Sequence, residues 1–195
     1  MADASIIKQA TQALVEILKT APGGFPVLSG PPERATGVSS STLILYLYQV
    51  LESSTAKNSG PRRTVISSTG KAQNIVVERD PLALDLYFLI IPATKVDDDL
   101  AFLDTYQMLG EAALALHDNG VFTLGQWVSD PAVKDIKLQV TMNPLTTTQL
   151  FELWEAVNQP YRLSVSYVVR TVRIDSQLTT DTPLVSKRQM QTTEV

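Results

Sequence analysis

The stretch from Tyr161 to Ser176, YRLSVSYVVRTVRIDS, is the feature that most constrains the fold of this chain. Apolar and polar side chains alternate in it with the two-residue period of a β-strand. At about 3.3 Å per residue it would span roughly 50 Å, whereas a usual strand has about five or six residues. The sequence therefore predicts one unusually long strand near the end of the chain.

The apolar face of this predicted strand changes sides halfway along. Its first half carries apolar residues at the odd positions Tyr161, Leu163, Val165, Tyr167 and Val169. From Val168 onward the apolar residues stand at even positions, namely Val168, Val172 and Ile174. Arg173 and Asp175 then occupy the side that was apolar, so the two halves of the strand call for different surroundings.

Length and composition predict one domain. The chain has 195 residues, of which 44% are hydrophobic and 18% are charged, and this supplies enough apolar material for a core. We expect a single domain over residues 1–175 and a polar C-terminal arm or tail over residues 176–195. The net charge of −4 argues against a nucleic-acid partner, since such proteins usually carry a basic surplus.

The chain contains no cysteine, and this rules out disulfides, thiolate chemistry and cysteine-bound zinc. Its first residues, MADASIIKQATQALVEILK, lack the long apolar core of a secretory signal. No stretch of about 18 residues is both apolar and uncharged, so we expect no membrane insertion. These features predict a soluble cytoplasmic protein.

The periodicity of the remaining sequence predicts an α+β fold, in which a mixed, largely antiparallel sheet is packed by two to three helices. Ser53–Gln73 is polar, has only weak strand character near Thr64–Ile66, and is interpreted as a long loop. The strand at 82–91 should stop at Pro92. The helices are expected at 4–19, 97–118 and 147–158, and the strands at 42–52, 82–91, 136–142 and 161–176.

The second predicted helix begins with three acids, Asp97, Asp98 and Asp99, which suit the positive end of a helix dipole. Apolar and small residues recur along one stripe of this helix. They are Leu100, Leu103, Tyr106, Gly110, Ala113, Leu114 and His117. The third predicted helix starts with a capping box formed by Thr146 and Gln149.

The sequence offers no catalytic, cofactor-binding or metal-binding constellation, so we expect the chain not to be an enzyme and to use no cofactor. His117 is the only histidine and suits a helix end better than a metal site. The segment STGK at 68–71 lacks the other residues of a phosphate-binding loop. Asp85 lies within a predicted buried strand, where we expect an arginine or a backbone donor to pair with it.

Charged residues are distributed unevenly. Lys57, Arg62, Arg63, Lys71 and Arg79 make one segment basic, whereas the segment from Asp97 to Asp118 has six acids and no base. Both segments could simply be solvated. Alternatively, Arg62 and Arg63 on one subunit meet Asp98 and Asp99 on the next, as in a head-to-tail ring.

Three segments in this order resemble the cap, or tail-terminator, proteins of phage-tail-like contractile injection systems. They are LYLYQVLESS, PLALDLYFLIIPATKVDDDLAFLDTYQMLGEAALALHDNGVF and LFELWEAVNQPYRLSVSYVVRTVRIDS. The resemblance rests on the Pro-Leu-x-Leu-Asp-Leu strand from Pro81 to Leu86, on a helix ending at Leu116–Asp118, and on Leu153-Trp154 leading into Tyr161–Tyr167.

The resemblance implies a structural role and a fold like that of phage tail terminators. Proteins of this family form a sixfold ring that ends the inner tube and anchors the last sheath layer. It therefore implies a hexameric homo-oligomer with the inner tube protein and the sheath protein as partners, within a particle assembled in the cytoplasm. The alternative is a tube or baseplate adaptor of the same type of particle.

This role suggests an interpretation of the long strand. Its first half would lie on the core of its own subunit, whereas Val172, Arg173 and Ile174 would face a partner. A β-bulge near Val168–Val169 would turn the strand over. The alternative is a bulged strand that the chain's own N-terminal helix covers along its whole length.

Overall fold

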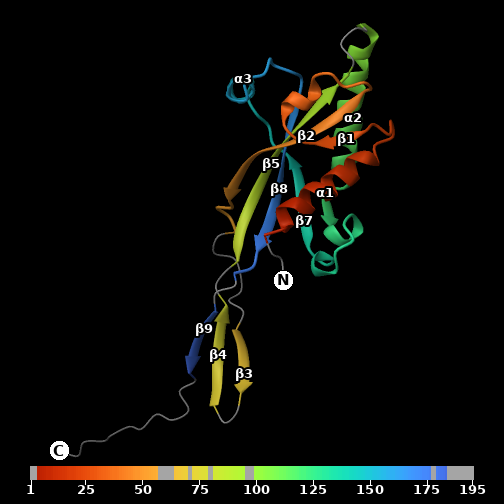
Figure 1. Cartoon of the computed structure of the whole chain (residues 1–195). Helices are drawn as coiled ribbons and strands as arrows, with labels where there is room; N and C mark the ends of the chain where they lie inside the picture. Colours follow the sequence, from red (N-terminus) through yellow and green to blue (C-terminus); the bar gives the residue numbers. More distant parts are fainter. Residues whose placement is uncertain are drawn as a thin grey trace, which may run out of the picture.

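The computed structural model describes residues 4–56, 64–69, 72–78, 81–94, 99–176 and 179–183. Figure 1 shows a tall, twisted sheet with helices α1 and α2 on one side and helix α3 on the other. The helices are α1 (Ile6–Lys19), α2 (Asp99–Asp118) and α3 (Thr147–Ala156), with short 3₁₀ turns η1 (Pro32–Ala35), η2 (Leu124–Gln126) and η3 (Pro131–Val133). The strands are β1 (Val27–Ser29), β2 (Thr42–Glu52), β3 (Thr64–Thr69), β4 (Ala72–Glu78), β5 (Leu82–Ala93), β6 (Val121–Thr123), β7 (Lys137–Met142), β8 (Val165–Ile174) and β9 (Thr179–Pro183).

The main sheet has six strands in the order β1-β2-β5-β8-β7-β6. Strand β1 runs parallel to β2, and every other neighbouring pair in this sheet is antiparallel. The predicted α+β class, with a mixed and largely antiparallel sheet, is therefore confirmed. Strand β5 lies inside the sheet between β2 and β8, which explains its almost continuous apolar sequence.

Strand β5 does not stop at Pro92 as predicted, because it continues to Ala93. Pro92 pairs with Leu43 of β2, whereas the pairing of β5 with β8 ends at Ile90. Beyond Ile90 the β8 side of β5 is a free edge in the described sheet. A residue without an N–H group is tolerated at such an edge.

Two hydrophobic cores cover the two faces of the main sheet. On β5, Phe88 and Ile90 point into the first core, whereas Leu89 and Ile91 point into the second. The first core also holds the buried side of α1, whose members are Ile6, Ala10, Ala13, Leu14, Ile17 and Leu18. The second core is smaller and is built around the fully buried Trp154 of α3.

Strand β8 contains the predicted irregularity, but two residues further along the chain. Val169 pairs with Leu86 and Val172 pairs with Leu84, so that Arg170 and Thr171 together stand opposite the single residue Asp85. This is the arrangement of a β-bulge, in which one extra residue is inserted into one strand.

The bulge keeps the apolar face of β8 on one side instead of turning it over. Val165, Tyr167 and Val169 precede it, Val172 and Ile174 follow it, and all five belong to or pack against the first core. Helix α1 packs on β8, as in the alternative of a strand covered by its own N-terminal helix. Val172 therefore does not face a partner as predicted, because it is fully buried in its own core, whereas a partner contact of Arg173 and Ile174, which are half-buried, stays a prediction. The extra residue moves the following side chains to the other face by one position. The apolar residues at even positions after the bulge therefore point to the same core as those at odd positions before it.

A second sheet is formed by segments predicted to be a loop and an arm. Strand β4 pairs with β3 on one side and with β9 on the other, both antiparallel. Figure 1 shows this sheet separate from the six-stranded one, beyond the ends of β2, β5 and β8. The interpretation of Ser53–Gln73 as a loop is wrong for Thr64–Thr69, and part of the predicted arm forms β9.

Replacing Val172 with aspartate should unfold the subunit. Val172 is 0% exposed, and a buried charge without a partner costs several kcal/mol. The matched control is Val50→Asp, because Val50 lies on β2 and is 40% exposed, so its variant should lose about 1 kcal/mol or less. The free energy of unfolding of both variants can be measured in urea, with circular dichroism as the probe. Equal stability of the two variants would show that β8 is not covered as described.

Candidate functional site

The most distinctive surface of the described chain is the outer side of α2. This helix packs on the sheet through Met108, Ala112 and Leu116, which belong to the first core. On its opposite side, Leu103, Tyr106 and Leu114 are 61%, 59% and 50% exposed. Helix α2 is therefore apolar on two opposite faces, and only one of them is covered by the described chain.

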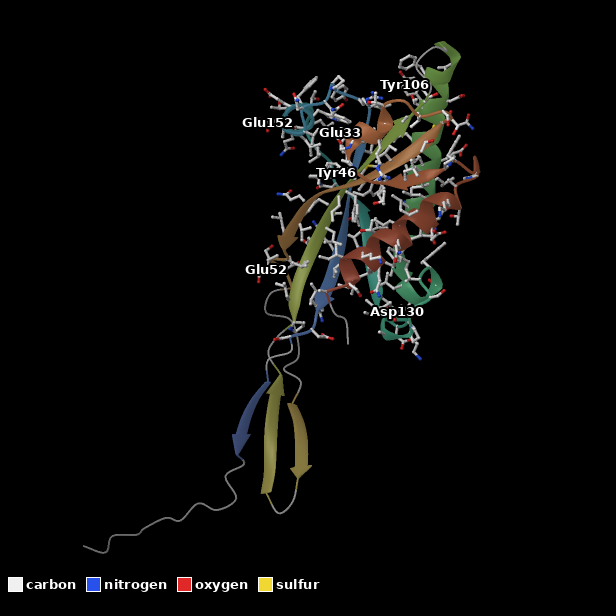
Figure 2. All side chains as sticks on the ribbon, in the orientation of Figure 1. Glu33, Tyr46, Glu52, Tyr106, Asp130 and Glu152 are labelled. Carbon is white, nitrogen blue, oxygen red and sulfur yellow. The ribbon has the colours of Figure 1, made fainter. Side chains whose placement is uncertain are left out.

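We call Leu103, Tyr106, Gly110 and Leu114 the outer stripe of α2. The sequence placed these residues on one common stripe, and the structure shows that this stripe is the exposed one. The covered side is formed by Thr105, Met108, Ala112, Ala115 and Leu116. Figure 2 shows Tyr106 near the end of α2 that is farther from the second sheet.

Two hollows lie along this helix. The larger, of about 830 Å³, lies between the C-terminal half of α2 and the strands β6 and β7, with Leu114, Val121 and Met142 in its lining. The smaller, of about 390 Å³, lies at the N-terminal half of α2, with Phe102, Tyr106 and Tyr161 in its lining. The outer stripe thus continues on both ends into apolar surface. Sequence reasoning did not identify this surface as a candidate site.

The charge on α2 is negative along its whole length. Asp99, Asp104, Glu111 and Asp118 are its only charged residues of fixed sign, and it carries no lysine or arginine. The last three are seven residues apart, which places them in one row along the helix. Within this row, Glu111 accepts hydrogen bonds from the Gly23 backbone N–H, at 2.6 Å, and from Gln107, at 2.8 Å.

The residues predicted to form an interface are not brought together in the described structure. Arg62, Arg63 and Asp98 lie outside the described residues, and Asp99 begins α2. Val172 and Ile174 belong to the first core region, as stated above, and Arg173 between them is half-buried. The head-to-tail contact between the basic and acidic segments stays a prediction.

Asp85 has the structural surroundings expected of it. It is 9% exposed and lies opposite the bulge, where its Oδ2 is 3.8 Å from Nε of Arg170. Within the described residues, Oδ1 of Asp85 is buried without a hydrogen-bond partner. The position pairs one buried carboxylate with one half-exposed guanidinium. No nucleophile or second acid stands in this pair.

Among the described residues, no group of three or more histidine, aspartate and glutamate side chains is placed to hold a metal ion. None of the described helices has the length and apolar character that crossing a membrane requires.

Tyr167 belongs to the lining of the larger hollow and to the first core. Burial raises the pKa of its phenol above the usual value of about 10, because the charged phenolate is poorly solvated there. The neutral form stabilises the fold, so this contribution is fully present below about pH 10 and is lost as the pH rises through the raised pKa.

The variant Tyr167→Phe should therefore lose less stability than the unchanged chain between about pH 9 and about pH 11. The free energy of unfolding, measured in urea at a series of pH values, tests this. An equal loss in both proteins would mean that the Tyr167 phenol is as well solvated in the folded state as in the unfolded one.

The chain is similar to a known protein family and to solved structures. The family model called Pvc16 N-terminal domain matches residues 9–188. No curated protein sequence matches the chain.

Two solved structures share the fold. One is the sheath/tube terminator, in the extended state, of an extracellular contractile injection system called PVC, at 17% identity and a TM-score of 0.65, with 100% of this chain and 66% of that chain covered. The other is the tube terminating cap of the anti-feeding prophage, at 16% identity and a TM-score of 0.61, with 94% of this chain and 60% of that chain covered. The chain thus spans less than two thirds of the length of each protein.

Proposed function

Because the chain belongs to the Pvc16 N-terminal domain family, we propose that it is a structural cap of a contractile injection system, which forms a ring, ends the inner tube and anchors the last sheath layer. The observation that carries this proposal is the likeness in fold, over the whole chain, to a sheath/tube terminator. The family match also confirms the resemblance to cap and tail-terminator proteins that was predicted from three segments of the sequence.

The proposed partners follow from what the two similar proteins terminate. One is named for both sheath and tube, and the other for the tube alone. We therefore propose contacts with a tube protein and with a sheath protein, and a ring of six copies that matches a sixfold tube. The particle that contains this ring would be assembled in the cytoplasm.

The proposed role needs no catalysis. The described chain places its buried carboxylate, Asp85, in an ion pair with Arg170. The two hollows beside α2 are lined mainly by apolar side chains, and His117 and Asp118, in the lining of the larger one, are consecutive residues at the end of the helix. A surface of this kind suits protein contacts better than turnover of a small molecule.

A ring subunit needs at least two surfaces, since a head-to-tail contact joins one patch to a different patch on the next copy. It also needs a surface for the tube end. The structure offers the uncovered side of α2 on the main domain and a separate three-stranded sheet. Both are available without disturbing the two cores.

Purified chain added to tubes of the inner tube protein should bind at one end of each tube only. Electron microscopy would show a plug of density there, and capped tubes should stop growing at that end when more tube protein is added. The control is tubes incubated without the chain, which should keep growing. Binding along the tube wall, or growth that continues past bound chain, would instead indicate an adaptor role.

A further inference from the structure

We infer that the outer stripe of α2 is the surface by which one copy of the chain packs against the next, and that it receives the outer face of the neighbour's α1. This inference deepens the proposed function and rests on it, because it assigns the contact between subunits of the proposed ring. Four observations carry it.

The first is the concentration of exposed apolar side chains around α2. Thirteen large apolar residues are exposed in the described chain, and eight of them lie on α2 or in the two hollows beside it. The eight are Phe102, Leu103, Tyr106, Leu114, Val121, Met142, Tyr161 and Leu163. Single exposed apolar residues are ordinary, whereas a contiguous set of this kind marks an interaction surface.

The second observation is the spacing of the outer stripe. Its members, residues 103, 106, 110 and 114, follow one another at intervals of three, four and four, which places them on one face of the helix, as in a face that packs on another helix. A helix on the surface of a monomer normally has one apolar stripe and one polar face. Helix α2 has two apolar stripes on opposite sides, so it is shaped to be covered on both.

The third observation is Gly110, which stands in the middle of this 20-residue helix and on the outer stripe. A Cβ atom added at Gly110 would meet no atom within 4 Å, so nothing within the described chain requires a glycine there. Glycine is the weakest helix former after proline. A glycine that the subunit itself does not need is explained if another helix approaches the backbone closely at this point.

The fourth observation is charge, and it selects the occupant. If two outer stripes faced each other, the rows of Asp104, Glu111 and Asp118 from two copies would come together and repel. The contact is therefore between different surfaces, as a closed ring requires. The outer face of α1 has a small positive charge, because it presents Lys8 together with Lys19, and Lys19 forms an ion pair with Glu16 at 2.7 Å.

The outer face of α1 is also left uncovered. Helix α1 packs on β1 and β8, helix α2 packs on β5 and β7, and the two helices pack on each other over the first core. In the proposed ring the outer face of α2 on one copy meets the outer face of α1 on the next. The α1 side offers a shallow hollow that includes Lys8 and Val15, and Leu28 of β1 is exposed beside it.

Cross-linking tests this assignment cleanly, because the chain has no native cysteine. The variant Leu114→Cys with Val15→Cys, treated with a short bismaleimide, should give a ladder of covalent oligomers. Each single variant should stay monomeric in a denaturing gel. Dimers from Leu114→Cys alone would show that two outer stripes face each other, and this would overturn the inference.

Native mass spectrometry of the untreated protein, with and without tubes, shows whether a ring forms. This separates failure of the proposed ring from failure of the proposed contact between α2 and α1. Rings without a ladder in the double variant would overturn the contact between α2 and α1 and leave the cap function standing. If no ring forms under either condition, both the ring and this contact fail.

A second variant separates assembly from folding. Gly110→Gln should raise the folding equilibrium constant about threefold, since glutamine is the better helix former and meets open space. The same variant should lose ring formation, because its side chain would occupy the place of the neighbour's helix. Glu152→Gln is the control, on the exposed side of α3 across the sheet (Figure 2), and it should still form rings. Rings from Gly110→Gln as abundant as those of the unchanged chain would overturn the inference.

Discussion

The bulge in β8 is the constraint on which the rest of the structure depends. One extra residue at Arg170–Thr171, opposite Asp85, restores the alternation that the sequence appears to break. Without it, Val172 would point away from α1, and α1 would no longer cover the part of the sheet around Val172 and Ile174. The ion pair between Asp85 and Arg170 lies at the bulge itself, where two residues face one. Strand β8 thus contributes to one continuous core of its own subunit from the start of the strand to its end.

Most of the main domain could be predicted because its elements carry strong local signals. Strand β2 spans Thr42–Glu52 as predicted, and the capping box of Thr146 and Gln149 opens α3. The second sheet could not be predicted in the same way. Its strands β3 and β9 are rich in serine and threonine, without a clear apolar alternation. Strands of this kind are specified by their pairing with neighbours, and that information is not local in the sequence.

The candidate surface was missed for a different reason. The sequence identified one stripe of α2 correctly as a stripe, but periodicity does not say which side of a helix faces the sheet. Helix α2 offers two choices, and the sheet is covered by the one that includes Met108 and Ala112. The available signal in the sequence was the small difference in apolar character between the two sides of α2. An element that is apolar on two sides usually has more than one neighbour.

The division of α2 into two faces has a consequence for how such a subunit is built. Both cores of the main sheet are closed by residues of the same chain, so folding of the main domain draws on the covered face of α2 and not on the outer one. The outer stripe is then free to be shaped by assembly alone. Gly110 fits this view, because it weakens the isolated helix while leaving room on its outer side. A protein that ends a tube, as we propose for this chain, has to remain folded before it meets that tube. Separate surfaces for folding and for assembly meet this requirement.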